Sequence, residues 1–454
     1  MRLPENAPSL EKALAVLTSD RIGQVMAHAN PLPNGKYLHW DELRRRPLPE
    51  ALTHEEWWAA VSLSRTSLFQ PLPLLDKQGR PFVFATPSPV AIDLHHIDRD
   101  AAGHIRTAAG APLHEDSQRY LMSSLIEEAI TSSQLEGAST TRKVAAAMLR
   151  SGRRPRDPSE RMIFNNYRAM EHLRAMRKVT LTPMHVLELH RMLTEDTLAD
   201  PADAGRYRCD DAVQVVDIRD GTPLHVPPAH AELPERMQRL CDFANADESA
   251  QPFVHPVLRA ILLHFMIGYD HPFADGNGRT ARALFYWSMA RSGYWLMEYT
   301  SISHILRKAP ARYMRAYLHT ETDKNDTTYF LLHQLQTVRE AIAALHAYVG
   351  RKTREQKETE RLLAASPSLR GHFNHRQVAL LNHALRNAGE AYRVDAHQRS
   401  HGVVYQTARH DLLELESQGL LEKTKQGNAF LFYAPADLYE RLTQLADGAK
   451  VPKR

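Results

Sequence analysis

The sequence predicts a mainly α-helical protein with one β-hairpin in its central part and a small helix–strand domain near its C-terminal end. Three observations support this prediction. Apolar residues recur at helical spacing through most of the chain, whereas strand-like alternation is confined to a few short stretches. No internal repeat or long low-complexity segment interrupts this pattern. The 454 residues are enough for about three folding units at roughly 150 residues each.

Charge and composition exclude several classes of protein. Lys and Arg total 57 and Asp and Glu total 53, and this balance is too even for a polycation that coats nucleic acid or membrane. Only Cys209 and Cys241 occur, so we expect neither a disulfide framework nor a Cys-rich zinc site. The longest apolar stretch, residues 260–269, is about half a membrane span. Residues 1–20 lack the apolar region of a signal peptide. We therefore expect a soluble, cytoplasmic protein without a membrane partner.

The N-terminal part, residues 1–115, is Pro-rich and is expected to form an irregular arm. Trp40, Trp57 and Trp58 are interpreted as hydrophobic anchors that tie this arm to the body of the protein. A helix is predicted from residue 115 to about residue 136. Gly137 fits the C′ position, where a left-handed turn ends a helix.

Further helices are expected at residues 158–176, 182–200, 234–245, 256–269 and 327–363. Between the second and third of these, residues 213–224 alternate β-branched residues around Asp220-Gly221, which predicts a β-hairpin.

The C-terminal part predicts a separate domain. Residues 341–370 are expected to be a helical linker that ends in the sequence ASPS at residues 365–368. Residues 371–436 contain three predicted helices and two strands, in the order of a winged helix-turn-helix. The helices are expected at residues 376–387, 394–399 and 405–418, and the strands at 420–425 and 430–433 across a turn at 426–428. Residues 437–454 follow as a tail.

The run of residues 271–282, HPFADGNGRTAR, has the character of a phosphate-binding loop. Gly276 and Gly278 allow backbone N–H groups to turn toward one point and form an anion nest. A helix beginning there adds the positive end of its dipole. Asn277 tolerates a left-handed backbone and supplies an amide. No GK[ST] follows, so a Walker A loop is disfavoured.

Ionisable side chains accompany this loop. Asp275 is placed to hold Mg²⁺ against bound phosphates. Arg279 and Arg282 are three residues apart, hence on one helical face, and each can pair with phosphate oxygens. His271, with an ordinary pKa near 6.5, is suited to take a proton from an incoming hydroxyl. Together these residues predict a site for attack on a nucleotide phosphate.

The same run matches the signature HPFx[DE]GNGRxxR of the Fic (Fido) family at every defined position. Proteins of this family mostly transfer AMP from ATP to a Ser, Thr or Tyr hydroxyl of a target protein. The resemblance implies a Fic-type helical bundle over residues 116–340, with His271 as general base and Asp275 as Mg²⁺ ligand. It also implies that the hairpin at residues 213–224 is the flap that holds the target segment by β-augmentation.

The resemblance further assigns nucleotide-binding roles. The backbone of Gly276, Asn277 and Gly278 would cradle the α- and β-phosphates. Arg279 would help to bind the phosphates, and Arg282 would clamp the γ-phosphate.

One tyrosine and its downstream neighbour complete these assignments. Tyr313 resembles a tyrosine that lines the adenine pocket. Seven residues later relatives often carry a polar amide, where this chain has Thr320.

An inhibitory element is also implied. Residues 132–137, SSQLEG, fit the motif [ST]xxxE[GN] with Ser132, Glu136 and Gly137 at its defined positions. Its place before the loop resembles the class whose inhibitory helix precedes the Fic core. A Glu136 carboxylate paired with Arg282 would occupy the position that the γ-phosphate needs, and ATP would then bind with its phosphates misplaced.

Three functions therefore remain open. The first is a protein adenylyltransferase inhibited by Glu136. The second uses the same site to remove AMP, with Glu136 orienting a water molecule. The third is a DNA-binding regulator in which the core senses nucleotide. Gln406 or Arg409 on the predicted recognition helix could read base edges, whereas Asp411, Glu414 and Glu416 dilute the positive field. A dimer contact is an alternative role for this domain, and a nucleotide other than ATP remains possible.

Overall fold

The computed structural model of the chain describes residues 3–15, 21–49, 52–102, 117–217, 220–365, 372–386, 390–426 and 429–446. Parts of several predicted features lie outside these ranges: residues 115–116, 218–219, 366–370, 387, 427–428 and 447–454. The chain divides into two compact units. One comprises residues 1–103 and 124–342, and the other comprises residues 104–123 and 343–454.

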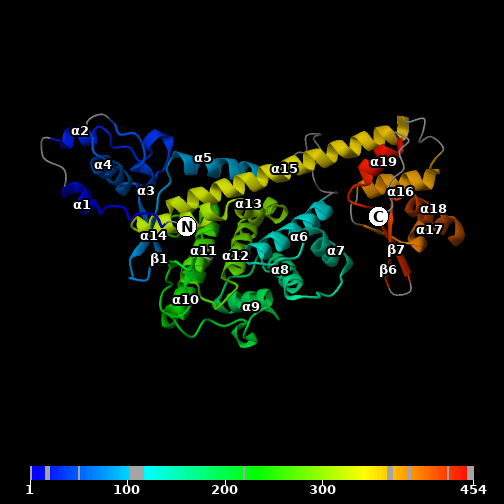
Figure 1. The fold of residues 1–454 in the computed structure, drawn as a ribbon, viewed down its shortest axis with the longest axis horizontal. Coiled ribbons are helices and arrows are strands. Elements are labelled where there is room, and N and C mark those ends of the chain that lie inside the picture. The colour runs from blue at the N-terminus through cyan, green and yellow to red at the C-terminus, as the bar shows by residue number, and fades with distance from the viewer. Residues whose placement is uncertain are drawn as a thin grey trace. The chain divides into compact units, whose positions relative to one another are not determined.

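Two helices that pack side by side form the centre of the first unit, α11 (Pro256–Asp270) and α12 (Asn277–Arg291) (Figure 1). Most residues of both helices are buried, because neighbouring elements cover them on several sides. Those neighbours include α8 (Pro158–Ala175), α9 (Pro183–Thr194) and α10 (Leu233–Asn245). The short loop between α11 and α12 is therefore held on a rigid scaffold.

The helix before this bundle, α6 (Ser117–Leu135), ends as predicted. Gly137 has a φ of 94°, and its N–H donates to the Gln134 carbonyl at 3.2 Å. The buried Glu128 carboxylate of α6 accepts hydrogen bonds from Ser301 at 2.8 Å and from the Ser303 N–H at 3.2 Å. These contacts cap α13 (Ile302–Lys308) and fix α6 against it.

The N-terminal region is more regular than the sequence predicted. It contains α4 (His54–Thr66), which begins with a capping box formed by Thr53 and Glu56. Strands β1 (Gln70–Leu75) and β2 (Pro81–Phe84) then form an antiparallel hairpin. The expectation of an irregular arm was wrong here, because Asp76 accepts the backbone N–H groups of the turn and compensates for the prolines of both strands.

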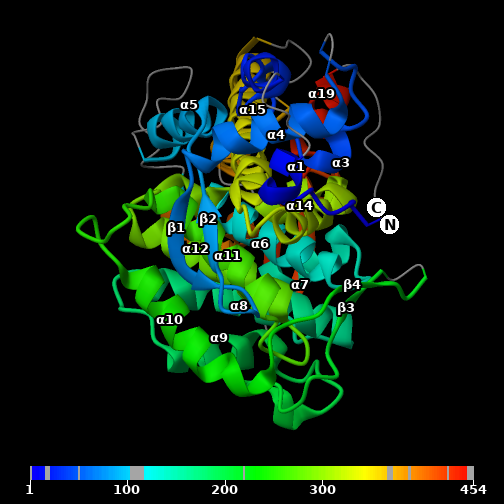
Figure 2. The ribbon, with the colours of Figure 1, turned by 90° about the vertical axis from the view of Figure 1, so that its left-hand side faces the viewer.

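The same region docks on the bundle through aromatic rings. Phe82 of β2 packs against Phe265 and Tyr269 of α11 with ring centroids 5.2 and 5.0 Å apart. The two strands lie beside α11 in Figure 2. Trp40, Trp57 and Trp58 lie in one buried cluster, but its other buried members also come from residues 25–61. The cluster is therefore a core of the N-terminal region itself, and the anchoring of this region to the body by these Trp residues stays a prediction. The other helices of this part are α1 (Leu10–Ala15), α2 (Ile22–Met26), α3 (Trp40–Leu43) and α5 (Ser88–Ile97).

The central hairpin is confirmed as two short antiparallel strands, β3 (Val215–Val216) and β4 (Pro223–His225). Figure 2 shows this hairpin at the edge of the helical body. The remaining helices are α7 (Arg142–Ser151), α14 (Pro310–Thr322) and α15 (Thr328–Ala365), the last of which contributes residues to both units.

The second unit combines helices with a three-stranded antiparallel sheet of order β5-β7-β6. Its helices are α16 (His375–Arg386), α17 (Val394–His401), α18 (Tyr405–Ser417) and α19 (Leu438–Ala446), and its strands are β5 (Ala391–Tyr392), β6 (Glu422–Gln426) and β7 (Ala429–Tyr433). Strand β5 was not expected, because two residues give no alternation to detect. Helix α19, in the predicted tail, buries Leu438 and Leu442 in the core of this unit.

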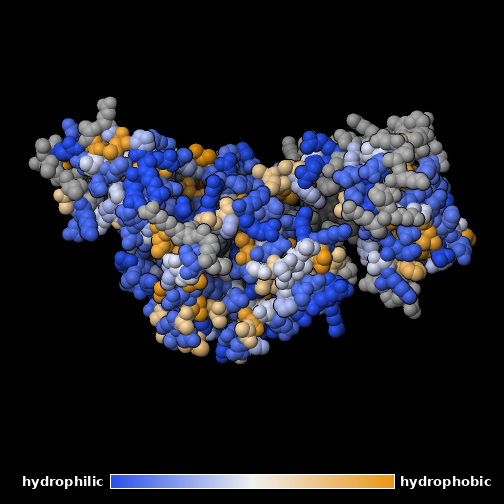
Figure 3. Space-filling model, viewed as in Figure 1, coloured by the Kyte–Doolittle hydropathy of each residue, from blue (hydrophilic) through white to orange (hydrophobic). Residues whose placement is uncertain are grey.

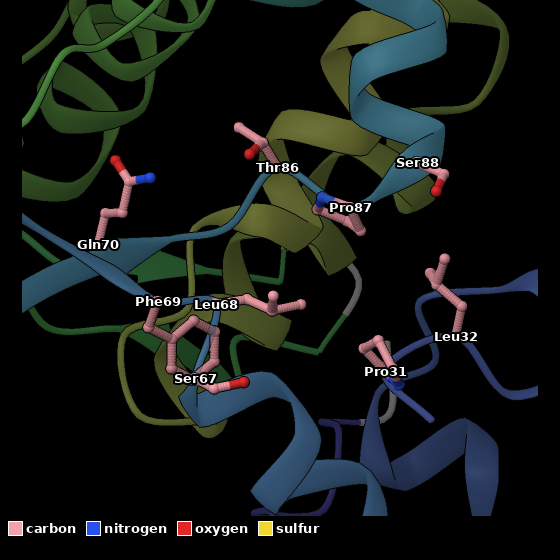
Figure 4. A pocket seen from close by; sticks show the side chains of 9 residues that line it. All are labelled: Pro31, Leu32, Ser67, Leu68, Phe69, Gln70, Thr86, Pro87 and Ser88. Atoms are coloured by element: carbon pink, nitrogen blue, oxygen red, sulfur yellow. The ribbon is translucent and has the colours of Figure 1, made fainter. Parts of the chain in front are cut away.

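An open pocket of about 490 Å³ lies in the N-terminal region (Figure 4). Its lining contains none of the predicted site residues; it consists of Pro31, Leu32, Ser67, Leu68, Phe69, Gln70, Thr86, Pro87 and Ser88. The face drawn in Figure 3 is mainly hydrophilic, with hydrophobic residues in separate spots. Within the described ranges, every helix is too short or too polar to cross a lipid bilayer.

Candidate active site

The loop between α11 and α12 has an unusual backbone. His271 adopts left-handed dihedral angles (φ 45°, ψ 56°), and Gly276 has a φ of 84°. The Asn277 side chain braces the loop by accepting from the Phe273 N–H at 3.0 Å and donating to the Phe273 carbonyl at 2.8 Å. Asn277 supplies its amide as expected, but its tolerance of a left-handed backbone is not used. Asn277 begins α12, and Gly276 makes the turn because it has no side chain.

His271 is oriented as a proton acceptor. Its Nδ1 lies 3.2 Å from the Gly268 carbonyl, which can only accept, so Nδ1 carries the proton and Nε2 keeps its lone pair. Burial is the main cause that lowers the pKa of His271 below 6.5. The ring is therefore neutral near pH 7, the form that a general base requires.

Arg208 holds the left-handed His271 in place. This arginine is 5% exposed, and its Nε donates to the His271 carbonyl at 3.1 Å. Its backbone N–H donates to the Pro272 carbonyl at 2.9 Å, and its Nη2 donates to the Pro228 carbonyl. A non-glycine residue with positive φ persists only where its surroundings fix it. Arg208 supplies that constraint.

His190 fixes the next part of the loop. Its Nδ1 accepts the Gly205 N–H at 3.0 Å, so its Nε2 carries the proton that it donates to the Asp275 carbonyl at 2.9 Å. The ring also stacks on Phe273 with centroids 3.8 Å apart. Burial lowers the pKa of His190 to about 4, which keeps this single tautomer at neutral pH.

The two glycines leave room for different neighbours. A Cβ on Gly276 would come within 2.7 Å of the Thr194 methyl group, so this glycine allows the loop to pack on α9. A Cβ on Gly278 would instead overlap the carboxylate of Glu136 and approach Arg282. The space over Gly278 therefore accommodates a negatively charged group, here the carboxylate of Glu136.

Arg279 has unused hydrogen-bonding capacity. Its side chain is fully buried, and Nη1 donates to the Leu193 carbonyl at 2.9 Å. Nε and Nη2 have no hydrogen-bond partner among the described residues, although Nη2 lies 3.7 Å from Asp275 Oδ2. Burial lowers the pKa of Arg279, since a buried charge lacks solvation. Such donors fit an anionic ligand.

The predicted pair of Glu136 and Arg282 is present. Glu136 Oε1 lies 2.8 Å from Arg282 Nη2, and the Ser132 hydroxyl and carbonyl accept from Arg282 at 2.9 and 3.0 Å. Burial would lower the pKa of Arg282, but the Glu136 carboxylate raises it above its ordinary value. The end of α6 thus satisfies the guanidinium of α12 with three oxygen atoms.

Tyr313, expected near the adenine base, and Thr320, at the position where relatives often carry an amide, both have partners inside the helical bundle. The Tyr313 hydroxyl lies 2.7 Å from His264 Nε2, inside the bundle. Thr320 is fully buried, and its hydroxyl donates to the Ala316 carbonyl of its own helix. Thr320 is therefore no substitute for the amide seen in relatives, and the contact between Tyr313 and adenine stays a prediction.

A metal ion would have few protein ligands here. Among the described residues, no group of three His, Cys, Asp or Glu side chains is placed to hold a metal. Asp275 is 58% exposed, and its Oδ1 accepts the Gly276 N–H at 2.5 Å. One accessible carboxylate beside an anion site suits Mg²⁺, which usually keeps several waters and binds substrate phosphates.

Sequence reasoning missed three residues of this site. Arg208, His190 and His225 each contact the ends of α11 or the loop, yet they come from separate segments. The spacing of each along the chain gives no sign that the fold brings them together.

Comparisons with known proteins agree with this geometry. Residues 180–289 match the family model described as Fic/DOC family. The protein adenylyltransferase Fic of Drosophila willistoni is 35% identical over 128 residues, which cover 28% of this chain and 23% of that protein. The protein of the same name from Drosophila melanogaster is 29% identical over 198 residues, which cover 43% of this chain and 37% of that protein.

A solved fragment of Fic-1 from C. elegans superposes with a TM-score of 0.48 at 19% identity, over 76% of this chain and 92% of that chain. The chain spans 23% to 37% of the length of the two curated relatives. The assignment rests on the matched sequence and on the loop inside it, and the chain therefore carries a Fic/DOC family domain at residues 180–289.

Proposed function

We propose that this chain is a protein adenylyltransferase that transfers AMP from ATP to a Ser, Thr or Tyr hydroxyl of a target protein and is inhibited by Glu136. The contact between Glu136 and Arg282 carries the proposal. A carboxylate already lies over Gly278 and against a buried guanidinium, so the site accommodates an anion without rearrangement. The curated relatives named protein adenylyltransferase make ATP the first donor to test.

His271 would act as the general base. In the reaction, the target hydroxyl oxygen bonds to the α-phosphorus, pyrophosphate leaves, and the hydroxyl proton passes to Nε2 of His271. The hydrogen bond from Nδ1 to Gly268 supports this role, because it directs the lone pair of Nε2 away from the helix. The lowered pKa of His271 supports it further.

The phosphates would lie on the loop and the start of α12. Backbone N–H groups at Gly276, Asn277 and Gly278 and the unused donors of Arg279 would stabilise their charge. Asp275 would hold Mg²⁺, and the ion would neutralise charge on the phosphate oxygens. Arg282 would bind the γ-phosphate once Glu136 has left it.

Glu136 inhibits in this proposal by occupying that last position. Arg282 already donates to Ser132 and Glu136, and the Glu136 carboxylate occupies the place where the γ-phosphate would approach this guanidinium. Helix α6 is also fixed by Glu128 at α13, which makes displacement of Glu136 costly. Misplacing the phosphates by about 1 Å is enough to slow transfer about 10²-fold.

The target would bind along the β3–β4 hairpin. Val216 of β3 is 42% exposed and Val226, directly after β4, is 44% exposed. A hairpin edge pairs with an extended segment through backbone hydrogen bonds, which supports recognition of a loop that presents its hydroxyl to the loop at 271–276. Backbone pairing selects shape more than sequence, so the hairpin does not identify the target.

A label-transfer experiment tests the proposal. The chain would be incubated with α-³²P-ATP and Mg²⁺ as wild type, as Glu136→Gly, and as Glu136→Gly/His271→Ala. We expect strong labelling of the chain or of lysate proteins by the single variant only. Equal labelling by the double variant would contradict the role of His271. Release of AMP from a labelled protein by the wild type, lost in Glu136→Gly, would instead favour the AMP-removing alternative.

Contact with duplex DNA through α18 is a second candidate. The burial of Asp411 favours it. This carboxylate accepts from Arg376 at 2.7 Å and does not face solvent, so its negative charge does not oppose DNA on the exposed face of α18. Arg409 remains exposed on the same helix. Titration of labelled duplex DNA at low salt tests this idea. We expect micromolar binding that weakens in Arg409→Ala, and no binding at micromolar protein would rule it out.

A further inference from the structure

His225, the last residue of β4, joins the hairpin to the end of α11. It is 7% exposed, and its Nε2 lies 2.7 Å from the Tyr269 carbonyl. Within α11 that carbonyl would normally accept from the N–H of Phe273, but Asn277 takes this N–H instead. His225 therefore satisfies an otherwise orphaned carbonyl two residues before His271.

The second ring nitrogen has an acceptor as well. His225 Nδ1 lies 2.7 Å from Glu321 Oε2 on α14. A backbone carbonyl only accepts, and an ionised carboxylate only accepts. Hydrogen bonds to both acceptors at once require a proton on each ring nitrogen. The negative end of the α11 dipole also favours a cation at this place.

The other charged groups near His225 have partners of their own. Asp270 at the end of α11 is already paired with Arg236 of α10, with Nε 2.8 Å from Oδ1. Lys77, in the turn between β1 and β2, donates to the carbonyl of Val226 at 3.0 Å. Arg208 contacts the His271 carbonyl from the residues that precede the hairpin.

A cation at this position affects the base. The pKa of His271 is lowered first by burial, and the positive charge of His225 lowers it further. Removing that charge would favour the protonated form of His271, which cannot accept the target's proton. Without the charge of His225, transfer should therefore begin to fail at a higher pH as the solution is acidified.

We propose that His225 is a positioning residue, which links the target-binding hairpin to the end of α11 that precedes His271 through its contacts with the Tyr269 carbonyl and Glu321. This inference rests on the proposed transferase function for its meaning. The link itself is a property of the fold, and it can be tested without any activity. Because His225 binds the carbonyl of Tyr269, two residues before the base, a target segment that docks on β4 would also hold the end of α11 that carries His271.

The first test measures backbone hydrogen–deuterium exchange of the full chain carrying Glu136→Gly. In the added variant His225→Gln, one amide cannot donate to both acceptors, so residues 220–226 and 269–272 should exchange at least about tenfold faster. The matched control is His95→Gln, an exposed histidine on α5, which should leave these peptides unchanged. In Glu321→Gln, His225 keeps a hydrogen-bond partner, so the increase should be smaller. This variant keeps the test valid if His225→Gln fails to fold.

The second test measures label transfer between pH 5 and 8. The acid limb should lie about half a unit or more higher in His225→Gln than in the control. A purely structural contact would lower the rate without moving this limb. If the Glu136→Gly chain transfers no label, the proposed function fails, and the titration of His271 followed by imidazole NMR replaces the rate profile. Exchange or titration identical to that of the His95→Gln control would overturn the proposal.

Discussion

Glu136 and Arg282, 146 residues apart in the chain, meet at 2.8 Å between Oε1 and Nη2. The guanidinium is nearly fully buried, whereas the Glu136 side chain is 26% exposed. The pair therefore joins a buried cation on α12 to a partly exposed anion directly after α6. A competing anion that reaches Arg282 must displace Glu136 but need not move the arginine.

Replacing Glu136 by Gly should raise label transfer at least about tenfold, because it frees Arg282 and the space over Gly278. Glu136→Gln should give an intermediate rate, since an amide can still accept from Arg282 but without charge. The measurement is initial-rate transfer from α-³²P-ATP. Glu127→Gln is the control on the same helix, where the side chain pairs with Arg142 at 2.6 Å, and it should not activate. If Glu127→Gln also raised transfer, any weakening of α6 would be enough for activation, and the contact between Glu136 and Arg282 would not be its specific cause.

Gly278→Ala should abolish transfer in the Glu136→Gly background without lowering thermal stability. The backbone at Gly278 is helical, so alanine itself stabilises this position by about 0.5–1 kcal/mol. The new methyl group would occupy the place where Glu136 now lies and a phosphate would bind. Gly350→Ala in α15 is the matched control, because no atom lies near its added Cβ. Normal transfer by Gly278→Ala would show that the phosphates bind elsewhere.

Arg208→Lys should lower kcat by about 10- to 100-fold and leave ATP binding unchanged. A lysine cannot donate to the His271 and Pro228 carbonyls in the planar arrangement that arginine offers. His271 would then lose the support of its left-handed backbone, and the base would be displaced. Arg206→Lys is the control two residues earlier, with an exposed pair to Asp203. Loss of ATP affinity in Arg208→Lys, measured by calorimetry, would place this arginine in nucleotide binding instead.

The sequence predicted most of the helices and the loop between α11 and α12, but it did not predict the distant residues that hold this loop in place. Helices with regular apolar spacing and Pro or Thr at their start, such as α9, were expected to within a few residues at their beginning. The hairpin β1–β2 was missed, because prolines obscured its alternation and its turn depends on hydrogen bonds from Asp76. His190 and His225 act through contacts with distant backbone carbonyls, and such contacts leave no periodic pattern in a sequence.

Acid should destabilise the first unit through histidines buried in the neutral form. Burial lowers the pKa of His190 and His333 to about 4, below the unfolded value near 6.5. The unfolded chain therefore binds more protons, and the stability that these residues contribute above pH 6.5 is lost as pH falls toward 4. Burial raises the pKa of Asp270 and Asp326 to about 6, which acts in the opposite direction.

The contribution of one histidine can be isolated by difference. For a shift of about 2.5 units, His190 contributes at most about 3 kcal/mol. Urea unfolding followed by Trp fluorescence at pH 7.5 and pH 5 should show that His190→Gln loses less stability on acidification than the wild type. An equal loss in both proteins would mean that His190 becomes protonated without cost in the folded state.

Asp411→Ala should destabilise the second unit by about 3–5 kcal/mol, the usual cost of leaving a buried charge unpaired. Asp411 is 1% exposed and accepts from Arg376, Asn374 and His397 at 2.7, 2.8 and 3.1 Å. Burial would raise the pKa of Asp411, but these hydrogen bonds lower it to about 2, so its contribution is present above pH 3.8 and is lost as pH falls through 2.

The control for Asp411→Ala is Glu416→Ala on the same helix. Glu416 pairs with Lys423 at 3.5 Å, and about a third of each side chain is exposed, so its loss should cost less than about 1 kcal/mol. Thermal unfolding of the full chain should show the transition of the second unit several degrees lower in Asp411→Ala and almost unchanged in Glu416→Ala. Similar shifts in both variants would contradict the view that Asp411 joins α16, α17 and α18. The DNA-binding proposal would then lose its support, because that proposal needs Asp411 to be engaged inside the unit.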